Sequence, residues 1–215
     1  MISDVPKQIK VQMRTDSRTS EKEWDRKLNI RTGGRDDSEA AGQNFPYEPT
    51  PYAVLERLAQ SGYIEKNDHV LDYGCGKGRV CFFLVSALGC RATGIDISEK
   101  LLKTAQDNRL RFRGKKQVDF QKCPAEQFEI TDEDIFFFFN PFTEVILRSV
   151  IGRIRESRKA ALRPARILCY YPSDEFVACL MTEPDLSFED EIDCRDLFAG
   201  NNERERILVF EMDTI

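Results

Sequence analysis

The chain has 215 residues, of which 41% are hydrophobic and 32% are charged, enough apolar material for the core of one soluble domain with an appended segment. Its net charge of −5 disfavours broad, non-specific binding to nucleic acid. Its mean hydropathy of −0.47, without any long uncharged apolar run, excludes a membrane span, and its polar start does not resemble a secretory signal.

Cysteine and histidine usage argues against a metal centre. The seven cysteines are scattered without a C-x-x-C pair, which is typical of reduced thiols in a cytoplasmic protein. His69 is the only histidine, and no G-x-S-x-G sequence accompanies it, so a Ser-His-Asp triad is not expected. We therefore predict no metal site and a cytoplasmic protein.

The first part of the chain, residues 1–46, is polar and weakly periodic, with interleaved charges. We interpret it as a mobile arm, or as a cap of one or two short helices, preceding a domain at 47–215. Trp24 either anchors this segment or covers a ligand, and anchoring is the more ordinary role of such a residue.

From residue 47 onward, short apolar runs alternate with amphipathic segments. Repeated β-α units predict an α/β fold with a parallel sheet covered on both faces, and the last two strands predict an antiparallel hairpin at one edge. No helix is expected between those two strands. The predicted strands are 70–73, 91–96, 118–121, 134–139, 166–171, 186–192 and 207–212, and the predicted helices are 51–62, 79–88, 98–112 and 144–162.

The strongest motif is the glycine turn of residues 70–78, VLDYGCGKG, which follows a strand and opens a helix. Gly74 and Gly76 allow the backbone to approach a ligand closely, and Gly78 allows tight packing of the helix. Asp96 ends the next strand and follows Gly76 by 20 residues, the spacing at which a carboxylate meets ribose hydroxyls. The pattern predicts an adenosine-type ligand across the strand ends.

The acid before the turn discriminates between two adenosine ligands. A dinucleotide turn has the spacing G-x-G-x-x-G and faces a pyrophosphate with a helix amino end, whereas this turn is G-x-G-x-G. Asp72 lies two residues before the first glycine and would repel a pyrophosphate. It suits a sulfonium with an ammonium group, so S-adenosylmethionine (SAM) is favoured over NAD. A tight turn without any ligand is the remaining alternative.

VLDYGCGKG and the GID that ends in Asp96 resemble the class I SAM-dependent methyltransferases, and the resemblance covers about residues 47–215. It implies a Rossmann-like three-layer α/β/α fold with a seven-stranded, mostly parallel sheet and one antiparallel edge strand. It also implies SAM as cofactor and S-adenosylhomocysteine as product, with Asp72 near the methionine end, Gly74 and Gly76 beneath it, and Asp96 on the ribose. The cofactor-binding residues expected in addition are Thr50, Tyr52, Cys75, Gly78, Ile97, Ala125, Glu126 and Asn140.

The segment that follows the third strand departs from the family. Pro124 stands where a side-chain contact to the adenine is usual. The backbone of Ala125 and neighbouring apolar groups then hold the ring, while Glu126 either caps a helix or contacts the ligand.

Asn140-Pro141-Phe142 ends the fourth strand and resembles the Asn/Asp-Pro-Pro-Tyr/Phe motif of amino-group methyltransferases. In those enzymes the Asn side chain and a proline carbonyl accept hydrogen bonds from the target amine, and the aromatic ring stacks on a planar substrate. The second proline is missing here, so an ordinary turn with Asn140 as helix N-cap is the alternative. Thr50 and Tyr52 either contact the SAM carboxylate or act as an N-cap and a core aromatic.

Residues 100–122 are strongly basic, and we favour a solvated helix face over a binding surface. The chain has no additional domain that could read a base sequence, so sequence-specific DNA binding is not expected.

The sequence thus predicts a SAM-dependent methyltransferase that acts on a small-molecule or exposed amine, with nitrogen favoured over oxygen as the acceptor. The alternative is a SAM-binding module without transferase activity that serves as a partner or regulator. Oligomeric state is not predicted.

Overall fold

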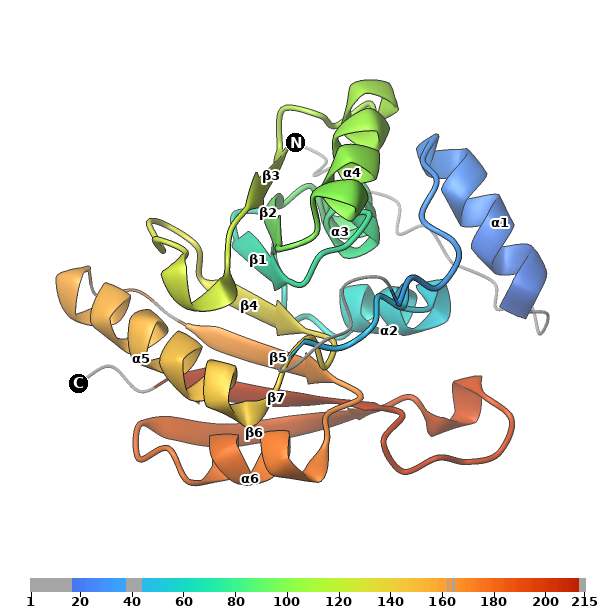
Figure 1. Ribbon diagram of the computed structural model, residues 1–215. Helices are drawn as coiled ribbons and strands as arrows, with labels where there is room; N and C mark the ends of the chain where they lie inside the picture. Colours follow the sequence, from blue (N-terminus) through green and yellow to red (C-terminus); the bar gives the residue numbers. More distant parts are fainter. Residues whose placement is uncertain (1–16, 38–43, 162, 164, 213–215) are drawn as a thin grey trace, which may run out of the picture.

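The computed structural model describes residues 17–37, 44–161, 163 and 165–212. Within this part of the chain, seven strands form one sheet in the order β3-β2-β1-β4-β5-β7-β6 (Figure 1). Neighbouring strands from β3 to β5 are parallel, whereas β7 is antiparallel to both β5 and β6. The strands are β1 (His69–Tyr73), β2 (Arg91–Asp96), β3 (Val118–Lys122), β4 (Ile135–Phe138), β5 (Arg166–Tyr170), β6 (Leu186–Asp193) and β7 (Arg206–Met212).

Helices cover both faces of the sheet, which makes a three-layer α/β/α arrangement (Figure 1). Side chains alternate between the two cores along each strand: Phe137 of β4 joins the core beneath α1 to α4, and Phe136 and Phe138 join the core beneath α5 and α6. The helices are α1 (Ser17–Leu28), α2 (Tyr52–Gln60), α3 (Arg79–Leu88), α4 (Glu99–Arg111), α5 (Glu144–Ala160) and α6 (Asp174–Met181), with 3₁₀ turns η1 (Ala125–Gln127) and η2 (Arg195–Leu197).

The predicted fold class is confirmed, including the antiparallel hairpin at one edge, which is β6 with β7. The reversed strand of the hairpin is β7, and β6 forms the edge itself. Helix α6 was not predicted. It is only eight residues long, and the Oγ of its N-cap, Ser173, accepts a hydrogen bond from Phe176 N at 3.2 Å. The predicted end of the fifth helix near Leu162 lies outside the described residues.

Helix α1, in the segment predicted to be an arm or a cap, packs against α2 and α3. Trp24 of α1 stacks on Tyr52 with ring centroids 5.7 Å apart, meets Phe83 edge-on, and donates a 2.8 Å hydrogen bond to Glu56. Leu28 is buried in the same core as these rings. The anchoring role predicted for Trp24 is therefore confirmed.

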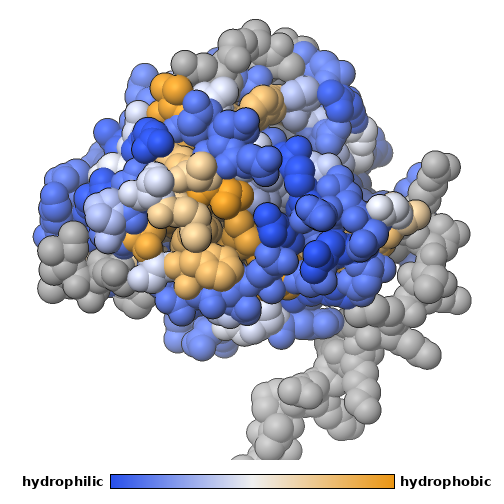
Figure 2. Space-filling view, turned by 90° about the horizontal axis from the view of Figure 1, so that it is seen from below, coloured by the Kyte–Doolittle hydropathy of each residue, from blue (hydrophilic) through white to orange (hydrophobic). Residues whose placement is uncertain are grey.

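Figure 2 shows hydrophobic residues gathered in one patch among hydrophilic ones on the face that carries β6 and α6. These two elements contribute the exposed Phe188 and Met181. Edge strand β6 also carries acidic residues and an irregular register between Phe188 and Asp190, features that oppose edge-to-edge pairing of sheets. In the described part of the chain, no helix has both the length and the apolar character that crossing a bilayer requires.

Candidate functional site

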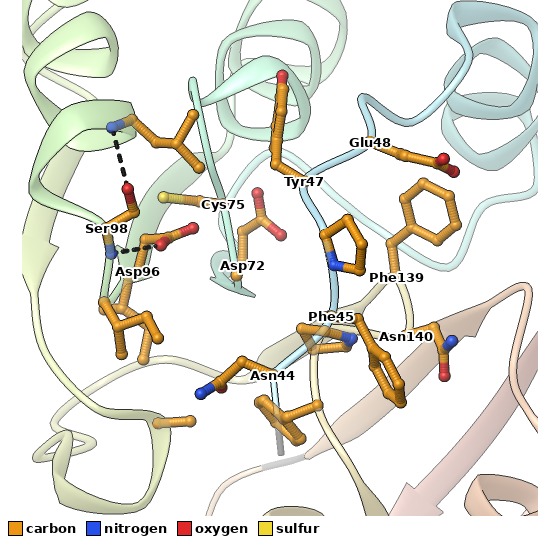
Figure 3. A pocket seen from close by; sticks show the side chains of 18 of the residues that line it. Asn44, Phe45, Tyr47, Glu48, Asp72, Cys75, Asp96, Ser98, Phe139 and Asn140 are labelled. Atoms are coloured by element: carbon orange, nitrogen blue, oxygen red, sulfur yellow. Dashed lines mark hydrogen bonds between the residues drawn. The ribbon is translucent and has the colours of Figure 1, made fainter. Parts of the chain in front are cut away.

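A cavity of about 480 Å³ opens at the carboxyl ends of the parallel strands, where such sheets bind ligands. Figure 3 shows Asp72, Cys75, Asp96 and Ser98 on one side of it and Glu48, Phe139 and Asn140 on the other. The two groups come from different strand ends: β1 and β2 carry the first, and β4 with the segment at 44–50 carries the second.

Four backbone amides of the glycine turn donate hydrogen bonds to acceptors within the protein. The N–H groups of Gly74 and Cys75 both donate to the carbonyl of Ile95, at 2.9 and 3.0 Å, and that of Gly78 donates to the Cys75 carbonyl at 2.8 Å. The Gly76 N–H donates to Asp96 Oδ2 at 2.8 Å. None of these four amides is left to face a pyrophosphate, which a dinucleotide turn requires.

Asp72 is a buried acid at the base of the cavity, with 3% of its surface exposed. The hydrogen bond recorded for its carboxylate in the described part of the chain comes from the Cys81 thiol, with Sγ 3.7 Å from Oδ2. Burial raises the pKa of Asp72 to about 8, and the nearby Asp96 adds to this increase. A ligand cation beside Asp72 would favour its ionised form.

Asp96 organises the adjacent turn. Its Oδ1 accepts a 2.8 Å hydrogen bond from Ser98 N, and Oδ2 accepts the Gly76 amide (Figure 3). Ser98 is the N-cap of α4, with its Oγ accepting from Leu101 N. The carboxylate therefore has a defined orientation between the turn and α4.

A strap of residues 44–50 crosses the strand ends and lines the cavity. Phe45 N donates to the Pro141 carbonyl at 3.2 Å, and Tyr47 Oη donates to the Thr32 carbonyl at 2.7 Å. The Tyr47 ring lies against Gly76, where a Cβ atom would overlap ring carbons. Gly76 thus permits close contact between the strap and the turn.

Asn140 follows β4 with a φ of 42°, a left-handed conformation that asparagine tolerates better than most residues. Its side-chain Oδ1 is buried and has no hydrogen-bond partner within the described chain. An unpaired buried acceptor is costly, so a ligand donor at this position would compensate for it. Phe139, Asn140 and Tyr171 line this half of the cavity together.

Comparison with known proteins identifies the domain. Residues 64–168 match the model of a methyltransferase domain family. The chain also resembles an RNA methyltransferase of Salinibacter ruber, solved in complex with S-adenosyl-L-homocysteine. The TM-score is 0.52 and the identity 20%, over 78% of this chain and 94% of that one, a likeness of fold. Residues 64–168 thus belong to a methyltransferase domain family, and the fold resembles that of an enzyme solved with the product of SAM-dependent methyl transfer.

Two curated relatives share part of this methyltransferase domain. The protein-lysine N-methyltransferase of Saccharolobus islandicus is 31% identical over 66 residues, which are 30% of this chain and 41% of the relative. The H3 lysine-79-specific histone-lysine N-methyltransferase of Dictyostelium discoideum is 28% identical over 106 residues, 43% of this chain and 6% of the relative. The chain thus spans less than half the length of either relative.

Most residues predicted for the site lie together in the methyltransferase domain. The predicted residues that line the cavity are Thr50, Asp72, Gly74, Cys75, Asp96, Ile97, Ala125, Glu126, Asn140, Pro141 and Phe142. Two alternatives are wrong, since Pro51 rather than Thr50 caps α2, and Thr143 rather than Asn140 caps α5. Glu126 lies in η1 and also lines the cavity, so both of its predicted roles remain compatible with its position.

Three predicted cofactor residues lie outside the cavity lining. Tyr52 is fully buried in the core, with its Oη donating to Asp25 at 2.7 Å, so the core-aromatic alternative is correct. Gly76 is covered by the Tyr47 ring, and Gly78 packs against Phe82 and Phe120. Both glycines serve close packing around the turn.

Sequence reasoning missed several lining residues, chiefly Phe45, Tyr47, Glu48 and Arg204. The prolines at 46, 49 and 51 mark the entry to a helix, but they do not indicate that this segment crosses the strand ends. Arg204 is remote in sequence and reaches the cavity from the loop between β6 and β7. Only the pairing of β7 with β5 brings that loop to the site.

Proposed function

We propose that this chain is a SAM-dependent methyltransferase whose acceptor is an amino nitrogen on a small molecule or an exposed group. The observation that carries the cofactor assignment is the glycine turn: four of its amides donate to acceptors within the protein, and its buried carboxyl group is that of Asp72. Such a turn suits a cationic ligand and not a pyrophosphate.

Residues at the ends of neighbouring strands would each bind a successive part of the SAM molecule. In our proposal, Cys123 to Glu126 and Ile97 surround the adenine, Asp96 receives the ribose hydroxyls, and Asp72 attracts the cationic methionine end. Phe142 is 4% exposed, and its ring packs edge-on against Tyr73 with centroids 6.3 Å apart. It closes the apolar floor instead of stacking on a planar acceptor.

In the proposed reaction, the bound sulfonium supplies a methyl group whose C–S bond breaks as the N–C bond to the acceptor forms, leaving S-adenosylhomocysteine and a proton. The protein's main task is alignment, which can supply roughly 7–11 kcal/mol of barrier lowering. Asn140 Oδ1 accepts a hydrogen bond from the amine and directs its lone pair. The names of the two lysine-specific relatives agree with an amine acceptor.

We further propose that residues 1–46 serve as a cap on a domain at 47–215. The hydrogen bonds from Phe45 N to the Pro141 carbonyl and from Tyr47 Oη to the Thr32 carbonyl keep the strap over the strand ends. A cap of this kind excludes water from the reacting groups.

Transfer of tritium from [methyl-³H]SAM tests this proposal. Primary amines and a lysine peptide are compared with their hydroxyl isosteres, and S-adenosylhomocysteine is quantified. Only amines are expected to be labelled.

Asn140→Ala should lower turnover by about 10²-fold, the typical cost of one oriented hydrogen-bonding group. Asn140→Asp, which keeps an acceptor oxygen, should retain more activity. Labelling of the hydroxyl isosteres would contradict the amine assignment, and SAM binding without transfer would favour the non-catalytic binding module.

A further inference from the structure

The carboxyl ends of the strands form an ordered row. Neighbouring strands β2, β1, β4 and β5 end near Asp96, Asp72, Asn140 and Tyr171 respectively. Adjacent strands lie about 5 Å apart. Tyr171 therefore lies one strand beyond the amide proposed to hold the amine, on the side away from Asp96.

Arg204 reaches this end of the row from the β6–β7 loop and lines the cavity. Its Nε donates to the Pro172 carbonyl at 3.0 Å and its Nη2 to the Tyr171 carbonyl at 3.1 Å. The guanidinium lies over the Tyr171 ring, 4.3 Å from the centroid. Asn202 of the same loop donates a 2.7 Å hydrogen bond to Tyr171 Oη.

The position of Tyr171 is itself defined by the fold. Its φ of 52° is left-handed, and its N–H donates to the Arg206 carbonyl at 3.0 Å. Two hydrogen bonds and a ring contact hold Arg204 to this platform. The guanidinium therefore has a fixed direction and loses little side-chain entropy when it binds a further group.

Arg204 differs from the other arginines that line the cavity. Arg35 pairs with Asp37 and Glu48, and Arg79 pairs with Glu21. No carboxylate of the described residues lies within ion-pair distance of Arg204. The pKa of Glu175 is lowered mainly by hydrogen bonds from its own backbone N–H and from Ser173, with a smaller contribution from Arg204. Its Nη1 donates to no described acceptor. The acceptor half of the cavity thus contains a cation that has no carboxylate partner among the described residues.

We propose that Arg204 binds an anionic group of the methyl acceptor, a phosphate or a carboxylate, through a charge-assisted hydrogen bond. This inference rests on the proposed function, which assigns this half of the cavity to the acceptor. The acceptor then carries its amine at Asn140 and its anion about one to two strand spacings away, roughly 5–10 Å. Aminoalkyl phosphates and amino acids with separated amine and carboxylate belong to this class.

Three matched probes test the proposal on the full chain saturated with S-adenosylhomocysteine. O-Phosphoethanolamine and 4-aminobutyrate, which have equal chain lengths between amine and anion, reach the lower end of that distance range, and ethanolamine carries no anion. Dissociation constants come from chemical-shift titrations of ¹⁵N-labelled protein. At least one anionic probe should bind tenfold or more tightly than ethanolamine, and the preferred probe distinguishes phosphate from carboxylate.

Arg204→Gln should reduce the preference to within twofold, and Arg204→Lys should restore part of it. Arg195→Gln is the control, since Arg195 pairs with Asp193 outside the cavity. A loop-fastening role alone would leave the ratio between probes unchanged. The proposal is overturned if the loaded wild type does not discriminate, or if Arg204→Gln discriminates as well as wild type. Failure of the wild type to bind S-adenosylhomocysteine would instead contradict the proposed function.

Discussion

At the scale of single residues, the protonation state of Asp72 affects both the stability of the free protein and the kind of ligand that it binds. The acid is buried and receives no backbone N–H from the four turn amides described above, so the free protein gains by keeping its carboxyl neutral. A cationic ligand removes that preference. The same residue therefore repels an anionic cofactor and couples binding of a cation to loss of a proton.

Binding of SAM should release the Asp72 proton. Because the pKa of Asp72 is raised to about 8 in the free protein, the carboxyl is mostly protonated at pH 6.5. The bound state holds fewer protons, so affinity should rise with pH up to about 8, by at most tenfold per unit. Calorimetry at pH 6.5 in buffers of different ionisation enthalpy should count close to one proton released for wild type and none for Asp72→Asn. Equal release by both proteins would contradict the assignment.

Gly76 is a second residue whose identity the structure explains. A Cβ there would overlap the Tyr47 ring, and the φ of 52° disfavours side chains. Gly76→Ala should lower the free energy of unfolding in urea by about 1–3 kcal/mol. Gly152→Ala is the control, since no atom lies within 4 Å of its added Cβ in α5, and alanine favours a helix by up to about 1 kcal/mol. Equal stability of wild type and Gly76→Ala would show that Tyr47 does not pack on the turn.

The residue roles differ in how far sequence predicts them. Asp72, Gly74 and Asp96 were predicted to line the cavity because spacing along one β-α-β unit determines where they lie. Tyr52 was wrong as a cofactor ligand, since its ring faces the cap instead of the strand ends. A tyrosine near a helix start gives the same local pattern in either orientation.

At the scale of elements, α1 is attached through the first residue of α3. Arg79 is 3% exposed, pairs with Glu21, and donates to Thr32 Oγ1 at 2.7 Å and to the Thr50 carbonyl at 3.1 Å. One side chain thus connects the cap, the strap and the helix that opens after the glycine turn.

Arg79→Met should loosen the cap. Loss of the guanidinium leaves Glu21 and Asp25 without their ion-pair partner, at a cost of about 3 kcal/mol. Trp24, the single tryptophan of the chain, should then shift its emission to the red as it leaves Tyr52. Arg26→Met, an exposed position on the same helix, should change neither stability nor emission. An unshifted spectrum for Arg79→Met would mean that apolar packing alone holds α1.

Periodicity predicted the strands and the long helices well because their apolar positions repeat over several turns or residues. It missed α6, whose eight residues give too short a pattern, and it left the cap undecided between a mobile and a docked segment. Docking depends on pairs such as Arg79 with Glu21, 58 residues apart, which no local pattern contains.

At the scale of the whole molecule, the strand order determines how the site is assembled. The order places the ends of β2, β1, β4 and β5 in a row, and the strap at 44–50 crosses it. β-α units predicted the parallel part of the sheet and hence the cofactor half of the cavity. The acceptor half draws on the strap and the β6–β7 loop, whose positions follow from long-range pairing such as β5 with β7.

Calorimetric titration of the full chain distinguishes a cavity that binds SAM from one that binds a dinucleotide. S-adenosylhomocysteine should bind and NADH should not. Asp96→Ala should weaken that binding at least tenfold, because hydrogen bonds to a charged group are worth about 1.5–3 kcal/mol. Asp119→Ala, an exposed acid on β3, should bind like wild type. Binding of NADH, or no binding of S-adenosylhomocysteine by wild type, would contradict the account.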